Sequence, residues 1–387
     1  MNFSRFRPLF FLCLGALFLS SCHRTISPDE RTARAKLRRA LRERSFAAAI
    51  PLARDVLRAA PKDNGAWARL AEAEVGLADW TGLRQTLAHW PRAVSRTSAK
   101  FDEYRGDLAR AEGRPAEAIA AWRKSVTRGG DNARVLTKIA RVEETNAHWE
   151  KAADAWEETL KLEKSADAFV HCARCFRHLH QWDQAHACLQ RAAQFAPNDP
   201  IVRQANEQFA RLGKFLAEVR DLDRELIVVP NDAERLADRA LLFLRAQEPE
   251  LALDDAKAAR RLSPNAIRPR LVAALALRAL GQGTAADRFG LQRGTRLETL
   301  APEFLQTLRQ LDAEIVTEPK SAELRVNRAW QLNENGQPQW ALTDAEKASK
   351  LNPASAGARA EASYALAKLG RTAEAYEQIK RATALDP

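Results

Sequence analysis

The sequence lacks the short motifs that mark the commonest catalytic and nucleotide-binding sites. Its 387 residues contain no Gly-x-x-x-x-Gly-Lys phosphate loop, no Gly-x-Gly-x-x-Gly dinucleotide turn, no Gly-x-Ser-x-Gly elbow and no His-Glu-x-x-His metal site. Asp and Glu are abundant, but their spacing follows exposed helix faces, where pairs with Lys and Arg four residues away are ordinary. We therefore expect a protein that is not an enzyme, with no cofactor and no small-molecule substrate.

An apolar run long enough to cross a bilayer is also lacking at the N-terminus. The run Leu9–Leu19 has 11 residues, whereas a membrane-spanning helix needs about 20. Arg5 and Arg7 precede it, and small residues follow it, as in a secretory signal peptide. The sequence therefore predicts export rather than a spanning helix.

The four residues Leu19-Ser20-Ser21-Cys22 resemble the lipobox of bacterial lipoproteins. The resemblance implies that residues 1–21 are removed and that Cys22 is lipidated as the first residue of the mature chain. His23, rather than Asp, follows it, which favours the outer membrane if the enterobacterial sorting rule applies. An ordinary signal peptide with a coincidental cysteine is the alternative.

Basic residues are in excess, with 61 Lys and Arg against 50 Asp and Glu. In a cytosolic protein this balance would suggest nucleic acid as a partner, but an exported lipoprotein does not encounter nucleic acid. We therefore expect no nucleic-acid partner. Residues 23–64 hold 11 basic and 5 acidic side chains. This segment could lie against anionic lipid head groups, or it could be a solvated helix face rich in arginine.

Proline recurs at a fixed interval near the C-terminus. Pro319, Pro353 and Pro387 are 34 residues apart, and small residues recur in register, such as Ala329 with Ser363. Each block is typical of two amphipathic helices of about 14 residues, with Gly between them and Pro after the second. Small residues stand where the helices cross, because larger ones would separate the backbones. This pattern resembles the tetratricopeptide repeat (TPR) family.

The resemblance implies an all-α protein, a right-handed TPR-type solenoid of about ten helix-turn-helix repeats that bury their apolar faces against their neighbours. The pattern is lost only at 284–302. We therefore expect a signal peptide at 1–21, an anchor linker at 22–30, an N-terminal TPR arm at 31–283, an irregular insertion or bend at 284–302 and a C-terminal TPR arm at 303–387.

Two features of the blocks give local predictions. The second helix should begin at an aromatic residue or at proline, which is tolerated because the first helical N–H has no intrahelical partner; these residues are Trp80, Trp149, Trp182, Pro115, Pro249 and Pro338. Arg239 with Asp255, and Arg328 with Asp344, are each 16 residues apart. We expect each pair to join the two helices of one repeat as a partly exposed salt bridge.

Histidine and cysteine concentrate in one place, because residues 171–188 hold four of the seven His and three of the five Cys. His171, Cys175 and His178 follow one helix face and are candidate metal ligands. Cys172, Cys175 and Cys188 are candidates for a disulfide between the helices of one repeat. Buried thiols that fill small apolar sites are the commoner outcome, so no metal is expected.

The TPR resemblance also implies a peptide-binding groove, lined by fixed positions of the first helix of each block. The implied groove residues are Lys138, Arg141, His171, Arg174, Arg177, His178, Arg203, Trp330 and Tyr364, with Leu271 and Leu275 between the last two groups. The groove would be basic in its middle and apolar or aromatic near its end. A partner segment with acidic residues followed by an apolar or aromatic one would complement it.

These features predict a membrane-anchored scaffold or adaptor of the bacterial cell envelope, facing the periplasm from the outer membrane. It would bind proteins of an assembly, secretion or export machinery through the groove. A metal- or redox-active periplasmic protein that uses residues 171–188 is the alternative function.

Overall fold

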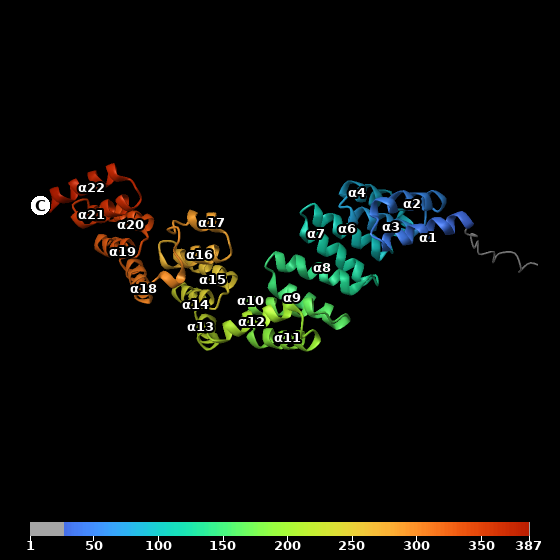
Figure 1. Ribbon diagram of the computed structural model, residues 1–387, viewed down its shortest axis with the longest axis horizontal. Helices are drawn as coiled ribbons and strands as arrows, with labels where there is room; N and C mark the ends of the chain where they lie inside the picture. Colours follow the sequence, from blue (N-terminus) through green and yellow to red (C-terminus); the bar gives the residue numbers. More distant parts are fainter. Residues whose placement is uncertain (1–26, 387) are drawn as a thin grey trace, which may run out of the picture. The chain divides into compact units, whose positions relative to one another are not determined.

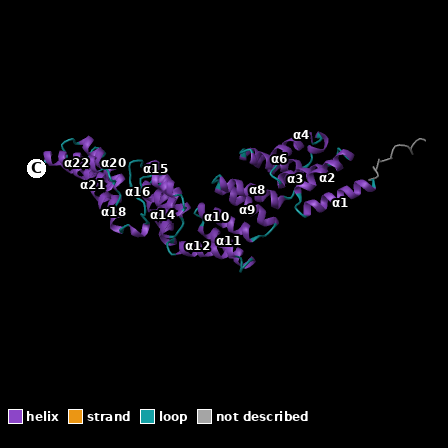
Figure 2. Ribbon diagram, turned by 45° about the horizontal axis from the view of Figure 1, so that its top comes forward, coloured by secondary structure: helices purple, strands orange, loops and turns teal. Residues whose placement is uncertain are grey.

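The computed structural model describes residues 27–386, which form helices, turns and loops and no strand (Figure 2). The predicted all-α class is confirmed for this part of the chain. The signal peptide and Cys22 lie outside the described residues. Within 27–386, every helix is too short or too polar to cross a bilayer.

Contacts divide the chain into two compact units, residues 1–164 and 165–387. The helices of the first unit are α1 (Pro28–Arg42), α2 (Phe46–Ala59), α3 (Asn64–Gly76), α4 (Trp80–His89), α5 (Arg92–Ser95), α6 (Ala99–Ala111), α7 (Pro115–Thr127), α8 (Asn132–Thr145) and α9 (Trp149–Leu162). The helices of the second unit are α10 (Ala166–His178), α11 (Trp182–Phe195), α12 (Pro200–Gly213), α13 (Leu216–Val228), α14 (Ala233–Arg245), α15 (Pro249–Leu262), α16 (Arg268–Ala279), α17 (Gly283–Arg288), the 3₁₀ turn η1 (Leu297–Thr299), α18 (Pro302–Thr317), α19 (Ala322–Glu334), α20 (Pro338–Leu351), α21 (Ala356–Lys368) and α22 (Thr372–Leu385).

Consecutive helices pack as antiparallel pairs, which is the TPR-type arrangement that the 34-residue period predicts. The best-packed pairs are α6 with α7, α8 with α9, α14 with α15, α19 with α20 and α21 with α22 (Figure 1). We call the first helix of a pair helix A and the second helix B. Helix A also packs on the next helix A, as α14 does on α16 and α19 on α21.

Helices A and B begin in different ways. Most helices A follow an Asp or Ser whose side chain accepts a backbone N–H of the first turn, for example Asp63 before α3 and Ser321 before α19. Helix B begins at tryptophan or proline at all six predicted positions, from Trp80 in α4 to Pro338 in α20. Of these six helices, α4 alone has such a cap, in which Asp79 accepts the N–H of Gly82. Those predictions are confirmed. Proline fits there because it lacks the N–H that a cap would satisfy.

The turn between helices A and B needs one residue in the left-handed region. Gly336 and Gly370 supply it in the last two pairs, with φ of 68° and 78°, at no steric cost. Ala78, Ala147 and other non-glycine residues take the same conformation in earlier pairs. The first unit therefore has the same turn geometry at Ala78 and Ala147, where the sequence has no glycine to indicate it.

Small residues occupy the crossings between paired helices, as predicted. Ala240 and Ala329 are completely buried, and Ala375 is nearly so. At the equivalent place in α6, a Cβ on Gly106 would lie 2.4 Å from Cδ1 of Trp122 in α7. Glycine there lets the buried indole lie directly on the backbone of α6.

The period is interrupted between Pro264 and Pro319, which are 55 residues apart instead of 34. The extra length lies in the short α17 and in residues 289–301, which we call the insertion. The insertion contains η1, and its Leu291 and Leu300 lie in the core of the second unit. How the chain divides into arms around this insertion stays a prediction.

Two three-helix segments flank the break and match each other with an offset of 89 residues. Segment α13–α15 contains Asp223, Arg239 and Asp255, and segment α18–α20 contains Asp312, Arg328 and Asp344 at the same spacings. Both segments have a lone helix followed by a well-packed helix pair. Each segment therefore carries one arginine between two aspartates.

Both predicted arginine–aspartate bridges form. Arg239 donates to Asp255 through Nε and Nη2, both at 2.7 Å, and Arg328 donates to Asp344 at 2.6 and 2.8 Å. The prediction that these pairs are partly exposed was wrong, because a second aspartate from the preceding helix B encloses each arginine. Asp223 lies 2.6 Å from Arg239, and Asp312 contacts Arg328 at 2.5 Å.

Candidate partner-binding groove

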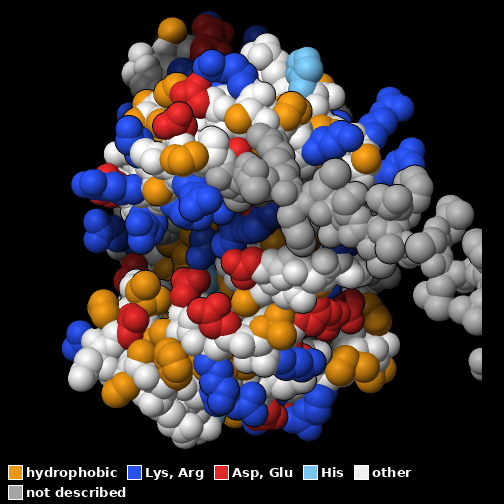
Figure 3. Space-filling view, turned by 90° about the vertical axis from the view of Figure 1, so that its right-hand side faces the viewer, with side chains coloured by type: hydrophobic (Ala, Val, Ile, Leu, Met, Phe, Trp, Pro, Cys, Tyr) orange, Lys and Arg blue, Asp and Glu red, His pale blue; other side chains and the backbone are white. Residues whose placement is uncertain are grey.

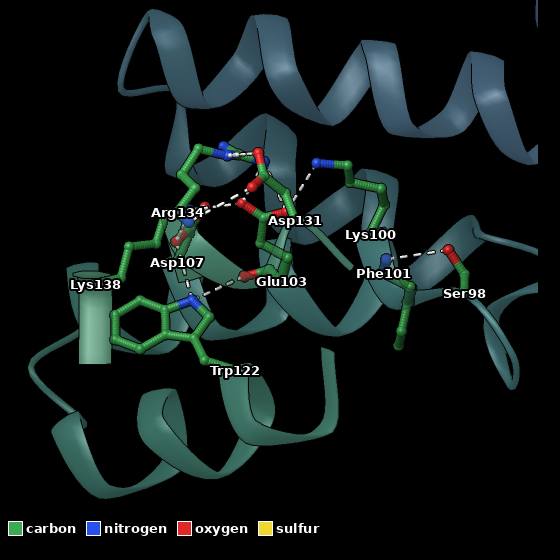
Figure 4. Close-up of polar contacts among 9 residues, drawn as sticks. All are labelled: Ser98, Lys100, Phe101, Glu103, Asp107, Trp122, Asp131, Arg134 and Lys138. Carbon is green, nitrogen blue, oxygen red and sulfur yellow. Dashed lines mark hydrogen bonds and ion pairs between the residues drawn. The ribbon is translucent and has the colours of Figure 1, made fainter. Parts of the chain in front are cut away.

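Lys138, the first of the predicted groove cations, is held by carboxylates of the preceding repeat (Figure 4). Its ammonium lies 2.8 Å from Oε1 of Glu103 and 2.8 Å from both oxygens of Asp107 on α6. Arg134 of α8 also donates to Glu103 at 2.8 Å, and Trp122 Nε1 donates to Asp107 at 3.1 Å. This network joins α6, α7 and α8. The positive charge of Lys138 is paired with Glu103 and Asp107 within the fold.

The electrostatics of Glu103 show how strongly these cations are engaged. Burial of this carboxyl group would raise its pKa, but the ammonium of Lys138, together with Arg134 and Lys100, outweighs that effect and lowers the pKa. Removing Lys138 would leave the buried carboxylate of Asp107 with the hydrogen bond from Trp122 but without its cation. We therefore interpret Lys138 as a link between α6 and α8, while its role toward a partner stays a prediction.

The predicted basic cluster on α10 is paired in the same way, by the beginning of α15. Arg174 donates to Glu250 at 2.8 Å, and Arg177 donates to Glu248. His178 is almost enclosed, with Nε2 3.6 Å from Glu250. These partners are more than 70 residues away in the sequence, so the repeat pattern gave no sign of them.

His178 and Glu250 affect each other's protonation. Burial disfavours the charged imidazole, but Asp254 and Glu250 outweigh it and raise the pKa of His178. The hydrogen bond from His178, aided by Arg174, lowers the pKa of Glu250 to about 2. The cations on α10 thus face acidic side chains of the same chain, whereas Arg141 and Arg203 are exposed.

The histidine and cysteine residues of the cluster lie on α10, on α11 and in the turn between them. His171 lies 3.5 Å from Asp167, on its own helix, while Cys172, Cys175 and Cys188 are buried in α10 and α11. Within residues 27–386, no group of three or more His, Cys, Asp or Glu side chains is placed to hold a metal ion. A disulfide among the three cysteines stays a prediction.

Leu271 and Leu275 do not line an open groove, so that prediction was wrong. They are 0% and 5% exposed, because α14, α18 and the insertion surround α16. Arg278 of α16 holds the insertion through the carbonyl oxygens of Gln292 and Thr295, at 3.1 and 2.9 Å. A cavity of about 610 Å³ remains between the insertion and the ends of α14 and α16.

A larger cavity, of about 920 Å³, lies between α13, α14 and α18. Glu234 and Asp238 of α14 stand on its wall, and Arg268 and Arg309 pair with both of them. The charges that face this cavity are therefore largely balanced from within the chain. It offers apolar surface but little that would select a partner by charge.

Trp330 and Tyr364, by contrast, are exposed on the last two helices A. They stand at the same position of consecutive repeats, on α19 and α21, and are 50% and 44% exposed. Earlier repeats have Leu241 and Leu275 at this position, both buried. We call the surface formed by Glu323, Val326, Trp330 and Glu334 of α19 with Ala360, Glu361, Tyr364 and Lys368 of α21 the C-terminal groove.

Polar contacts fix the two helices of this groove against each other. Asn333 of α19 donates its Nδ2 to the carbonyl oxygen of Glu361 at 3.1 Å and to its carboxylate at 2.7 Å. Both of these atoms accept hydrogen bonds, so the orientation of the Asn333 amide is settled. A Cβ on Gly357 would lie 3.4 Å from Val326, which confirms that these positions face each other.

Glu334 and Glu361 were not singled out from the sequence, although they occupy groove positions. Burial raises the pKa of Glu361, and the nearby charge of Glu334 raises it further, against the hydrogen bond from Asn333. Lys368 lies 5.2 Å from the ring centroid of Tyr364. The groove thus combines two half-exposed aromatic rings with several carboxylates.

Near the N-terminus, helix α1 exposes a basic surface. Its exposed cations are Arg31, Lys36, Arg38, Arg39 and Arg42, and one of them, Arg39, pairs with Glu43 at 2.7 Å. Figure 3 shows Lys and Arg side chains in several groups on one face of the molecule, with Asp and Glu among them. Both interpretations of the basic segment, lipid contact and a solvated face, are compatible with this surface.

Comparisons with known proteins add little to this geometry. No protein-family model matches the sequence, and no curated protein matches it. Among solved structures, one of Naa15/Naa10 bound to HypK-THB is 14% identical over 93% of this chain with a TM-score of 0.37, and the chain spans only 64% of its length. MamA is 18% identical over 48% of this chain and 89% of its own, with a TM-score of 0.23.

The APC/C hetero-tetramer Cut9-Hcn1 is 12% identical over 93% of this chain and 88% of its own, with a TM-score of 0.32. All three TM-scores are below 0.5, so these likenesses carry no argument about what the chain binds. The TPR-type fold rests on the helix pairs, caps and crossings described above.

Proposed function

We propose that this protein is a protein-interaction scaffold that binds a segment of its partner in the C-terminal groove. The observation that carries the proposal is the half exposure of Trp330 and Tyr364 at a position where the repeats of α14 and α16 bury Leu241 and Leu275. Tyrosine and tryptophan are the commonest anchors of protein interfaces, since each buries a large area at low entropic cost. The Asn333–Glu361 contact joins the two helices that carry the rings.

The proposal extends to the location of the protein. A lipid anchor at Cys22, implied by the lipobox resemblance, would hold the scaffold at the bacterial outer membrane, facing the periplasm. The basic surface of α1 would then stand close to lipid head groups. Partners would be proteins of an envelope assembly, secretion or export machinery.

A capture experiment tests the groove. Partners are collected from detergent-solubilised envelope on the wild-type protein and on Trp330→Ala plus Tyr364→Ala. We expect the double variant to lose the specific partners, since loss of a true anchor typically costs about 2 kcal/mol or more. Tyr376→Ala, which removes an exposed tyrosine on α22 outside the groove, is the matched control.

The proposal fails if the double variant captures the same proteins as the wild type. It also fails if Tyr376→Ala removes them equally well, because binding would then use the outer face of the last repeat.

A further inference from the structure

The charges of the C-terminal groove are unbalanced. Glu323 and Glu334 of α19 are exposed, and Glu361 of α21 is partly exposed. Among residues 27–386, none of the three is joined to Lys or Arg by a salt bridge, and Lys368 is the one basic side chain at the groove positions of α19 and α21. This contrasts with α10, where each arginine has an acidic partner from α15.

The carboxylates of the C-terminal groove also repel each other, and a bound cation would reduce this repulsion. The hydrogen bonds from Asn333 hold Glu361 against α19, and the negative charge of Glu334 on the same helix raises the pKa of Glu361. Like charges placed close together on a partly buried surface repel, and a cation placed between them removes that repulsion. The groove is therefore prepared for positive charge.

The aromatic rings favour the same chemistry. The face of a tryptophan or tyrosine ring attracts a cation placed within about 6 Å of its centroid. Lys368 already uses the ring of Tyr364 in this way, at 5.2 Å. The ring of Trp330 is half exposed, and no cation stacks on it among the described residues.

We infer that the partner segment bound by the C-terminal groove carries a lysine or arginine next to an apolar side chain. The cation lies between Glu334 and Glu361 and against the Trp330 ring, and the apolar side chain covers Val326 and Tyr364. This inference rests on the proposed function and names its partner class. It differs from the acidic segment that Lys138, Arg174 and Arg177 suggest, because those three residues pair with carboxylates within the fold.

Three acetylated ten-residue peptides test the inference on the full chain. They alternate leucine with lysine, with glutamine or with glutamate, and their binding is measured by isothermal titration at low and at physiological salt. We expect the lysine peptide to bind about tenfold more tightly than the glutamine peptide, and the glutamate peptide to bind least. Glu334→Gln plus Glu361→Gln should bring the lysine and glutamine peptides within about twofold of each other. Glu374→Gln plus Glu377→Gln, an equal charge change on α22, should leave the tenfold preference unchanged.

The outcomes separate this inference from the proposed function. If Trp330→Ala weakens all three peptides and the wild type does not prefer lysine, the groove binds partners but the inferred charge class is wrong. If the lysine preference survives in the Glu334→Gln, Glu361→Gln variant, the cation binds elsewhere and the inference is overturned. If no peptide binds the wild type, a basic and apolar segment is not sufficient and the inference is also overturned, while the capture experiment still decides on the groove.

Discussion

Arg328 carries its charge into the interior of the second unit, where Asp312 and Asp344 hold it from both sides. It is 1% exposed, and Asp312 also accepts the backbone N–H groups of Ile267 and Arg268, at 3.0 and 2.8 Å. One side chain therefore joins α19 to α18 and α20, and Asp312 extends the link to the beginning of α16. A buried pair of this kind is sensitive to the loss of one partner, because the other charge stays buried.

We expect Arg328→Leu to destabilise the second unit by about 3–5 kcal/mol, since two buried carboxylates would lose their cation. Urea unfolding followed by circular dichroism measures the loss, and hydrogen exchange assigns it to α18–α20. Arg371→Leu, which breaks an exposed pair with Glu374, should leave unfolding almost unchanged. Equal effects of the two variants would show that the buried triad has no special role.

Glu74 is the second charged residue whose burial matters. It is almost completely buried in α3, where Thr86 of α4 donates to its Oε1 at 2.9 Å. Burial is the main cause that raises its pKa from 4.5 to about 7. The folded protein therefore keeps the Glu74 proton up to about pH 7, whereas the unfolded chain releases it near pH 4.5.

Because the folded state binds this proton more tightly, the contribution of Glu74 to stability is greatest below pH 4.5 and is lost as the pH rises towards 7. We expect the free energy of opening of α3 and α4 to fall by about 2–3 kcal/mol over this range. Glu74→Gln should remove most of that fall, and Glu72→Gln, on the exposed side of the same helix, should not. Hydrogen exchange of α3 and α4, measured between pH 4.5 and 7.5 in the wild type and in both variants, tests this prediction. If the opening free energy of Glu74→Gln falls with pH as much as that of the wild type, the prediction is wrong.

At the scale of the helix pair, the crossing residues set how closely helices A and B approach. Ala240→Leu, Ala329→Leu and Ala375→Leu should each cost about 1–3 kcal/mol, because the added side chain has no space between the helices. Ala217→Leu on the exposed side of α13 is the control. Thermal unfolding of the four variants measures the effect, and no change in any of the three crossings would contradict the tight packing.

Much of each element could be predicted from the sequence, because the signals are local. A tryptophan or proline begins helix B, a small residue marks the crossing, and Arg239 and Arg328 meet an aspartate 16 residues later. Asp223 and Asp312 were missed, because they belong to the preceding helix and stand outside the block in which each arginine was considered. Their matching offset of 89 residues was the available signal.

Which groove residues are exposed and which are paired or covered could be predicted only in part. Groove positions follow from the repeat, and Trp330 and Tyr364 are indeed exposed. Whether a groove residue is free depends on contacts between distant repeats, such as those of Arg174 and Arg177 with the beginning of α15. The insertion that covers α16 has no repeat pattern, so nothing in the sequence placed it against Leu275.

At the scale of the whole molecule, the proposed lipid anchor would decide where the protein works. We expect Cys22→Ala to abolish fatty-acid labelling and to release the protein into the soluble periplasmic fraction, because several acyl chains hold a protein far more firmly than one. Cys13→Ala, within the segment that the lipobox resemblance implies is removed, should keep the label. Wild-type protein that is soluble and unlabelled in its own host would contradict the lipoprotein prediction.

The insertion over α16 has a consequence for the kind of sequence that the protein can recognise. The insertion binds Arg278 of α16, where Leu271 and Leu275 are buried, and the exposed aromatic residues stand on the next two helices A, α19 and α21. Neighbouring helix axes are about 8–10 Å apart, and an extended chain advances about 3.3 Å per residue, so a bound segment needs only about six residues to cross both. A linear motif of this length arises by chance in many proteins. Selectivity would then come from confinement at one membrane, where a shared surface raises the effective concentration of the right partner.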